Sequence, residues 1–192
     1  MSSKIDIISS AFLLLGHDTI NSLNDPGYTN RVAQNTYDNM VQFELTKSNW
    51  TFARVKAQLA QLTTDPIDEF ANAFQIPSDR LKILFIRPSS RYKIYRDQIF
   101  TNAGGPLFLD YIANVGEDEW PPSFTQVAIF ALAANWGIPI REGFTTRAAL
   151  KEDYAEASRI ARADDSTQNP QDPIRSNPFV AARLGNDHPA GF

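Results

Sequence analysis

Residues 81–112, "LKILFIRPSSRYKIYRDQIFTNAGGPLFLDYI", decide the fold class of this 192-residue chain. Four short runs rich in branched and aromatic residues occur within this stretch, at 81–86, 92–96, 98–102 and 107–112. Turn-forming residues separate the runs, including Pro88 after the first run and "AGGP" before the last. Short runs with this punctuation are typical of strands joined by tight turns. The sequence therefore predicts a small antiparallel meander over about residues 77–112.

Two helices are predicted before the meander. In the first, "SSKIDIISSAFLLLG", Ser3 can cap the start and Gly16 can end the helix. The second lies in residues 24–50, is about 20 residues long, and has Asp25 as a candidate cap and Pro26 in its first turn. Its expected buried stripe is Ala33, Tyr37, Met40, Val41 and Leu45. After this helix the period weakens, and "AQLAQL" is interpreted as an extended connection.

Two further helices are predicted after the meander. The segment "PPSFTQVAIFALAANWG" begins with prolines, which a helix tolerates at its start, and is apolar on nearly every side from Val127 to Ala134. Such a helix is expected to be buried on all sides by other elements. The last helix, "TTRAALKEDYAEASRIARADD", has a narrow apolar stripe of Leu150, Tyr154, Ala157 and Ala161. We interpret Tyr154, Ala157 and Ala161 as candidates for a subunit interface.

This order of elements predicts an α+β fold dominated by helices. We expect a four-helix bundle with one small antiparallel sheet inserted between its second and third helices. The domain would cover residues 1–165, and residues 166–192 would form an extended C-terminal docking tail.

Composition excludes several classes of function. The chain has no cysteine, which rules out disulfides and thiolate sites and fits a reducing cytoplasm. A formal net charge of −4 argues against binding of a phosphate backbone as the main task. The basic stretch "RPSSRYKIYR" is interpreted as an exposed strand, with a nucleic-acid strand as the alternative. We expect neither a secretory signal nor a membrane span.

The common signatures of catalysis are missing from the sequence. The two histidines, His17 and His188, are not in a metal-ligand spacing, and no phosphate-binding or nucleophile motif is found. The acidic run Glu117–Glu119 beside Trp120 resembles a sugar-cleaving site in composition only. Asp164 and Asp165 lie at the unfavourable end of a helix, which suggests a cationic partner. We expect no enzyme activity, no metal and no cofactor.

The chain after the last helix contains apolar side chains without a helical or strand period. Apolar side chains give no stability to a tail that stays fully solvated, so they indicate a contact with another surface. The candidate anchors of a docking tail are Ile174, Arg175, Phe179, Val180, Arg183 and Leu184.

The order of segments resembles that of the head-to-tail adaptor proteins of short-tailed bacteriophages, the tail tubular protein A group. The resemblance covers roughly residues 4–165, and its most specific part is Phe74, Ile76, Pro77 and Asp79 before a strand. The segments that carry it are "IISSAFLLLGHDTINSL", "SNWTFAR", "FQIPSDRLKILFI", "FLDYI", "WPPSFTQVAIFALAANWGIPI" and the Ala-rich last helix.

The resemblance implies a structural virion protein made in the host cytoplasm. Typically twelve copies would form a ring between the capsid portal and the tail nozzle, through which genomic DNA passes without specific binding. It also implies that the C-terminal tail lies against the portal protein. Two alternatives remain open: a virion-associated peptidoglycan or carbohydrate hydrolase that uses the acidic loop, and a cytoplasmic adaptor that docks partners through its C-terminal peptide.

Overall fold

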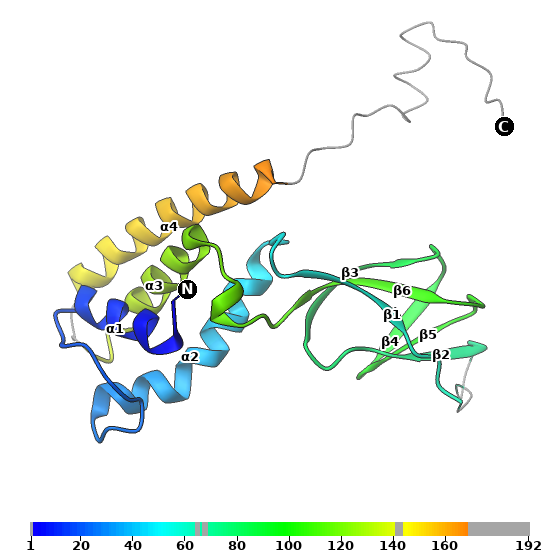
Figure 1. Ribbon diagram of the computed structural model, residues 1–192, viewed down its shortest axis with the longest axis horizontal. Coiled ribbons are helices and arrows are strands. Elements are labelled where there is room, and N and C mark those ends of the chain that lie inside the picture. The colour runs from blue at the N-terminus through cyan, green and yellow to red at the C-terminus, as the bar shows by residue number, and fades with distance from the viewer. Residues whose placement is uncertain (1, 64–65, 67–68, 141–143, 169–192) are drawn as a thin grey trace, which may run out of the picture.

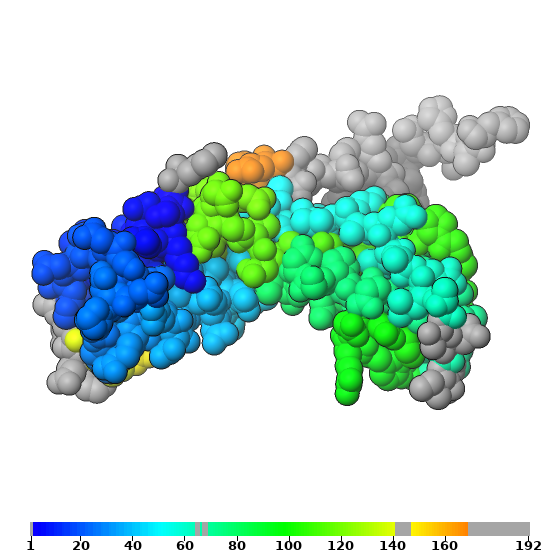
Figure 2. All heavy atoms as spheres, turned by 60° about the horizontal axis from the view of Figure 1, so that its bottom comes forward, coloured from blue at the N-terminus to red at the C-terminus, as the bar shows by residue number. Residues whose placement is uncertain are grey.

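The computed structural model describes residues 2–63, 66, 69–140 and 144–168. Within this part of the chain there are four α-helices, one short 3-10 turn and six strands. Figure 1 shows the helices gathered at one end of an elongated molecule and the strands at the other. The space-filling view shows the same two parts, with the N-terminal helices in blue and the strands in cyan and green (Figure 2).

Helix α1 (Lys4–Leu14) begins as the sequence predicts. The Ser3 hydroxyl accepts a hydrogen bond from the Asp6 backbone N–H, and the Asp6 carboxylate accepts one from the Ser3 N–H. This reciprocal pair satisfies two amides that the helix start would otherwise leave unpaired. Gly16 has a φ of 78° and follows the last turn, in the left-handed conformation that glycine adopts without strain.

Helix α2 (Tyr28–Lys47) has the expected length of 20 residues but begins later than predicted, with Gly27 at its N-cap. Asp25 is not the cap, and Pro26 is not in the first turn. Instead, the Asn30 side-chain amide donates to the Asp25 carbonyl oxygen at 3.1 Å, which holds residues before the helix as a loop. The predicted stripe is confirmed, since Ala33, Tyr37, Val41 and Leu45 are buried and Met40 is partly buried.

Helix α3 (Pro122–Trp136) is the centre of the helical part and packs against α1, α2 and α4. Its residues from Val127 to Ala134 are buried except for the half-buried Phe130, which confirms the expected cover. Helix α4 (Phe144–Thr167) runs beside α3 along its length (Figure 1). The predicted stripe of α4 is also confirmed: Leu150 and Ala161 are buried, and Tyr154 and Ala157 are partly buried against the core.

The six strands form two three-stranded antiparallel sheets. One sheet has the order β1-β6-β3 and the other β2-β5-β4. The strands are β1 (Arg54–Leu59), β2 (Asn72–Gln75), β3 (Arg80–Arg87), β4 (Tyr92–Tyr95), β5 (Gln98–Thr101) and β6 (Leu107–Ala113). The four predicted strands are therefore present, but they do not form a meander, because β3 pairs with β6 rather than with β4.

The predicted fold, a helix-dominated four-helix bundle with one small inserted sheet, is wrong. The residues that the structure describes form two sheets, and 45% of them are helical and 22% lie in strands. The β part begins at Arg54, not near residue 77, because the sequence analysis missed β1 and β2. Their sequences, "RVKAQL" and "NAFQ", are weak as isolated strand signals, and they become strands by pairing with β6 and β5.

The β part has a hydrophobic core of its own, separate from the core of the helices. Its buried members are Leu59, Phe74, Ile76, Ile86, Ile99, Leu107, Leu109, Tyr111 and Ala113. Strand β6 links the two cores, since Tyr111 packs in the β core while its neighbour Ile112 packs in the helical core. This alternation follows from the two-residue period of a strand.

Candidate docking surface on the last two helices

Helices α3 and α4 leave an open hollow of about 350 Å³ between them. It is lined by Ser123, Gln126, Phe130, Asp153, Glu156, Ala157 and Ile160, and we call it the α3–α4 hollow. The centre is apolar: Ile160 is 45% exposed, and Phe130 and Ala157 are partly buried. Exposed apolar surface bordered by polar side chains is the composition of a protein-binding site.

The border of the α3–α4 hollow is acidic. Glu156 accepts two hydrogen bonds from the Arg159 guanidinium, at 2.9 and 2.7 Å. These bonds lower the pKa of Glu156 below its ordinary value, with a smaller contribution from the charge of Arg159. Asp153 is exposed one turn earlier on the same helix. The hollow therefore has two carboxylates at the border of an apolar centre, that of Glu156 already paired with Arg159 and that of Asp153 exposed, which suits a partner with cationic and apolar side chains.

The three residues predicted for a subunit interface lie in different environments. Ala161 is 1% exposed and belongs to the core of its own chain. Tyr154 points toward α2, and Ala157 lines the α3–α4 hollow. Contact of these residues with a second subunit stays a prediction. Of the three, Ala157 is the residue that lines an open hollow, where a second subunit could reach it.

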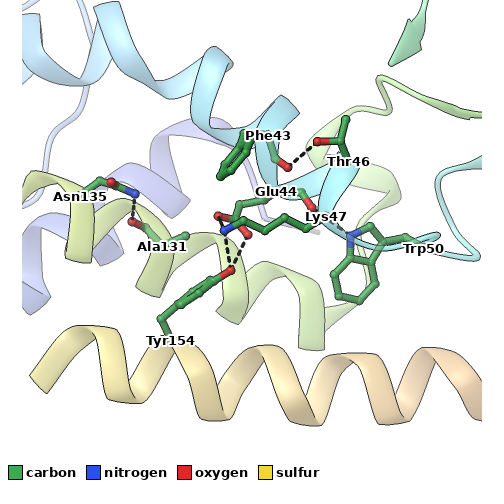
Figure 3. A network of polar contacts seen from close by, with 8 residues as sticks. All are labelled: Phe43, Glu44, Thr46, Lys47, Trp50, Ala131, Asn135 and Tyr154. Carbon is green, nitrogen blue, oxygen red and sulfur yellow. Dashed lines mark hydrogen bonds and ion pairs between the residues drawn. The ribbon is translucent and has the colours of Figure 1, made fainter. Parts of the chain in front are cut away.

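Tyr154 belongs to a polar network that fastens α4 to α2 (Figure 3). Its hydroxyl donates to one carboxylate oxygen of Glu44 at 2.9 Å, and Lys47 Nζ donates to the other at 2.7 Å. Glu44 is only 5% exposed, so this pairing offsets the cost of burying its charge. Glu44 is not among the residues predicted from the sequence, although its spacing of three residues from Lys47 on one helix indicates an ion pair.

The same network holds Lys47 in its charged form. Partial burial by itself lowers the pKa of Lys47, but hydrogen bonds to Glu44 and Tyr154 outweigh this and raise the pKa above its ordinary value. The network forms part of the wall of a second hollow of about 450 Å³, together with Met40, Phe43 and Lys151 among others. Phe43 is 62% exposed at its edge. Because the ionised groups are paired with one another, we interpret the network as structural.

The acidic run forms a 3-10 turn, Glu117–Glu119, directly before α3. The Tyr37 hydroxyl donates to Glu117 Oε1 at 3.0 Å, and burial, followed by the Glu117 charge, raises the pKa of Tyr37 well above its ordinary value. Glu117 and Trp120 line a hollow of about 410 Å³ together with Tyr37, Asp38 and Lys4. One of the three acids thus fastens the turn to α2, while Asp118 and Glu119 are not part of that bond.

Asp165 has a partner within its own chain. Its carboxylate accepts hydrogen bonds from the backbone N–H and the hydroxyl of Thr51, at 2.9 and 3.2 Å. The suggested cationic partner for Asp165 is therefore unnecessary, because these donors offset the unfavourable position at the end of a helix.

The remaining predicted sites lie elsewhere. All six candidate anchors of the tail, from Ile174 to Leu184, lie outside the described residues, as does His188. His17 follows α1, and its backbone N–H donates to the Phe12 carbonyl oxygen at 2.9 Å. Across the part of the chain that the structure describes, no three His, Asp or Glu side chains are grouped to hold a metal. No helix in that part is long and apolar enough to cross a membrane.

No protein-family model matches the chain, and no curated protein has a significantly similar sequence.

Proposed function

We propose that the protein is a structural virion component, a ring-forming adaptor that joins the capsid portal to the tail nozzle and lets genomic DNA pass. The observation that carries this proposal is the α3–α4 hollow, with its exposed Ile160 and acidic border. A neighbouring subunit in a ring would cover Ile160 and the apolar centre of the hollow. Twelve copies is the number that we propose for the ring.

The charge of the chain is compatible with a DNA channel. A lumen through which DNA slides must avoid strong contacts to phosphates, and the formal net charge is −4. We propose that the DNA is not bound specifically.

Attachment to the portal is assigned to the C-terminal tail. Its apolar and arginine side chains can act as anchors. A ring presents many tails to the portal at once, so contacts that are weak one by one combine into a stable attachment. The proposed portal-docking residues are Ile174, Arg175, Phe179, Val180, Arg183 and Leu184.

The mass of the purified chain, measured alone and with portal rings from the phage that encodes it, tests this proposal. We expect a closed ring, either by itself or on the portal. A chain that remains monomeric under both conditions, up to millimolar concentration, would contradict the proposal.

A hydrolase is the second candidate function, because Glu117, Asp38 and Trp120 border one hollow. Carboxylates beside an aromatic ring are a common arrangement for cleavage of sugars. The Tyr37–Glu117 bond gives Glu117 a structural role that needs no catalysis. Release of soluble fragments from peptidoglycan by the pure protein would favour the hydrolase.

A further inference from the structure

One face of the β1-β6-β3 sheet gathers cations around two phenylalanines. The strand register places Lys56, Asp110 and Phe85 in one row across the sheet and Gln58, Phe108 and Arg87 in the next. Arg54 lies two residues before Lys56 and therefore on the same face. We call the surface of Arg54, Lys56, Phe85, Arg87 and Phe108 the cationic face. It carries three exposed bases in a chain whose net charge is negative.

The cations of this face cover its aromatic rings. The guanidinium carbons of Arg54 and Arg87 lie 5.2 and 5.0 Å from the centre of the Phe85 ring, and Lys56 Nζ lies 5.6 Å from that of Phe108. Contacts of this kind hold long side chains in place and so reduce the entropy lost on binding. They also occupy the aromatic faces on which the bases of a nucleic acid would stack.

A buried carboxylate lies in the middle of the cationic face. Asp110 is 5% exposed, and its Oδ2 accepts a hydrogen bond from Arg54 at 2.9 Å. Its Oδ1 has no hydrogen-bond partner among the described residues. The negative charge of Asp110 disfavours a phosphate at this position on the face. The face therefore suits a protein surface with carboxylates at its border better than a phosphate backbone.

We propose that the cationic face docks onto the α3–α4 hollow of a second copy of this chain, an inference that rests on the ring proposed above. The two surfaces are complementary in charge: Lys56 and Arg87 lie on the cationic face, and Asp153 lies at the border of the hollow. They also match in composition, since each carries apolar side chains: Phe85 and Phe108 on the cationic face, and Phe130 and Ile160 in the hollow.

A contact between two different surfaces of identical chains is heterologous, and such contacts close into rings when the rotation between copies allows it. Arg54 and Glu156 already have ion pairs within their own chain, with Asp110 and Arg159, so Lys56, Arg87 and Asp153 carry the charge complementarity of the contact. The chain beyond residue 168 is a poorer match to the cationic face, because its two Asp residues and two Arg residues cancel.

Reciprocal charge reversal tests the contact. One variant carries Lys56→Glu and Arg87→Glu, and the other carries Asp153→Lys and Glu156→Lys. We expect each variant alone to assemble at least about ten-fold more weakly than the wild type, because like charges then face each other. An equal mixture should recover assembly, since each reversed surface meets its complement. Arg31→Glu with Arg96→Glu reverses two exposed bases elsewhere and should leave assembly unchanged.

The Lys56→Glu substitution places a second carboxylate opposite Asp110 and can disturb folding, so a milder variant accompanies it. Lys56→Gln with Arg87→Gln removes the charges without adding carboxylates and should also weaken assembly. Circular dichroism of every variant separates a loss of folding from a loss of contact.

Cysteine cross-linking locates the contact directly, because the chain has no native cysteine. Gln58→Cys marks the cationic face and Gln126→Cys marks the hollow, both at exposed glutamines. A mild oxidant should give a dimer in the mixture of the two variants and little in either alone, with Arg31→Cys as the unreactive partner. A symmetric contact would instead cross-link a single variant with itself.

Two results would overturn this inference while leaving the ring intact. One is normal ring assembly by both charge-reversed variants. The other is tight binding of a single-stranded oligonucleotide that is lost in the Lys56→Gln, Arg87→Gln variant, which would make the face a polyanion site. A wild-type chain that never assembles, alone or on the portal, contradicts the inference together with the proposed function.

Discussion

Asp165 and Thr51 lie 114 residues apart in the sequence and are joined by two hydrogen bonds. The Asp165 carboxylate accepts both, from the backbone N–H and from the hydroxyl of Thr51. The bonds fasten the last turns of α4 to the segment that leads from α2 into β1. The end of the last helix is thereby tied to the point where the helical part meets the β part.

Asp165→Ala should destabilise the isolated subunit by about 1.5–3 kcal/mol, because it removes hydrogen bonds to a charged acceptor. Urea unfolding at neutral pH measures the change. Asp164→Ala is the matched control, since Asp164 is exposed, and its effect should stay within about 0.5 kcal/mol. Equal effects of the two substitutions would show that the Thr51 contact adds nothing.

Ala157→Glu should block assembly of the ring. Ala157 is partly buried and lines the α3–α4 hollow, where the neighbouring subunit is proposed to pack, so a longer side chain overfills the contact between the two subunits at a cost of about 1–3 kcal/mol. Ala155→Glu, on an exposed position of the same helix, should assemble normally. Native mass measurement distinguishes the two, and normal assembly of the Ala157 variant would remove this surface from the interface.

Truncation after Gln168 should leave the thermal stability of the subunit unchanged and abolish attachment to the portal. The cut retains all of α4 and the Asp165 contact. Calorimetry of the isolated chain and co-sedimentation with portal rings measure the two properties. Retained portal binding with a large fall in stability would mean that the tail belongs to its own domain.

Stability should fall as the pH rises above about 10, where unfolded tyrosine and lysine lose their protons. Burial raises the pKa of Tyr37 and Tyr111, and the Glu44 and Tyr154 bonds raise that of Lys47. The folded state therefore keeps protons that the unfolded state releases, so the stabilisation is complete below this range and is lost above it. Urea unfolding between about pH 8 and pH 11, on either side of these ordinary values, measures the slope.

Tyr37→Phe should reduce this alkaline slope, because it removes the group with the largest upward change in pKa among those named. At neutral pH the variant should lose about 0.5–1.5 kcal/mol, since the hydrogen bond to Glu117 is gone. Tyr28→Phe changes an exposed tyrosine and is the control. An unchanged slope in the Tyr37 variant would assign the alkaline loss to other groups.

Replacing Glu117, Asp118 and Glu119 by Gln, Asn and Gln should leave folding and assembly nearly intact. The Glu117→Gln substitution keeps an oxygen that can accept the Tyr37 bond, and exposed charges usually contribute within about 0.5 kcal/mol. Turbidity of a peptidoglycan suspension provides the activity measurement. Activity in the wild type that disappears in this variant would refute the structural function.

Elements with strong local signals could be predicted from the sequence. The signals for the Ser3 cap, for the burial of α3 on all sides and for the apolar stripe of α4 each lie within a single helix. Local spacing decides which side chains share a face of that helix, so these features can be predicted from the sequence. The four strands from β3 to β6 were found for a similar reason, since their branched and aromatic runs end at turn residues.

Strand pairing and the meeting of polar groups depend on long-range packing instead. Strand β1 pairs with β6 about fifty residues later, so neither partner alone indicates the sheet. Likewise, Glu44 meets Tyr154, Thr51 meets Asp165, and the cations of the cationic face collect over Phe85 and Phe108 only after the sheets and helices have packed. Periodicity reports which residues share a face of one element. The choice of partner depends on the free energy of burying that face against an element distant in the sequence, which no local pattern contains.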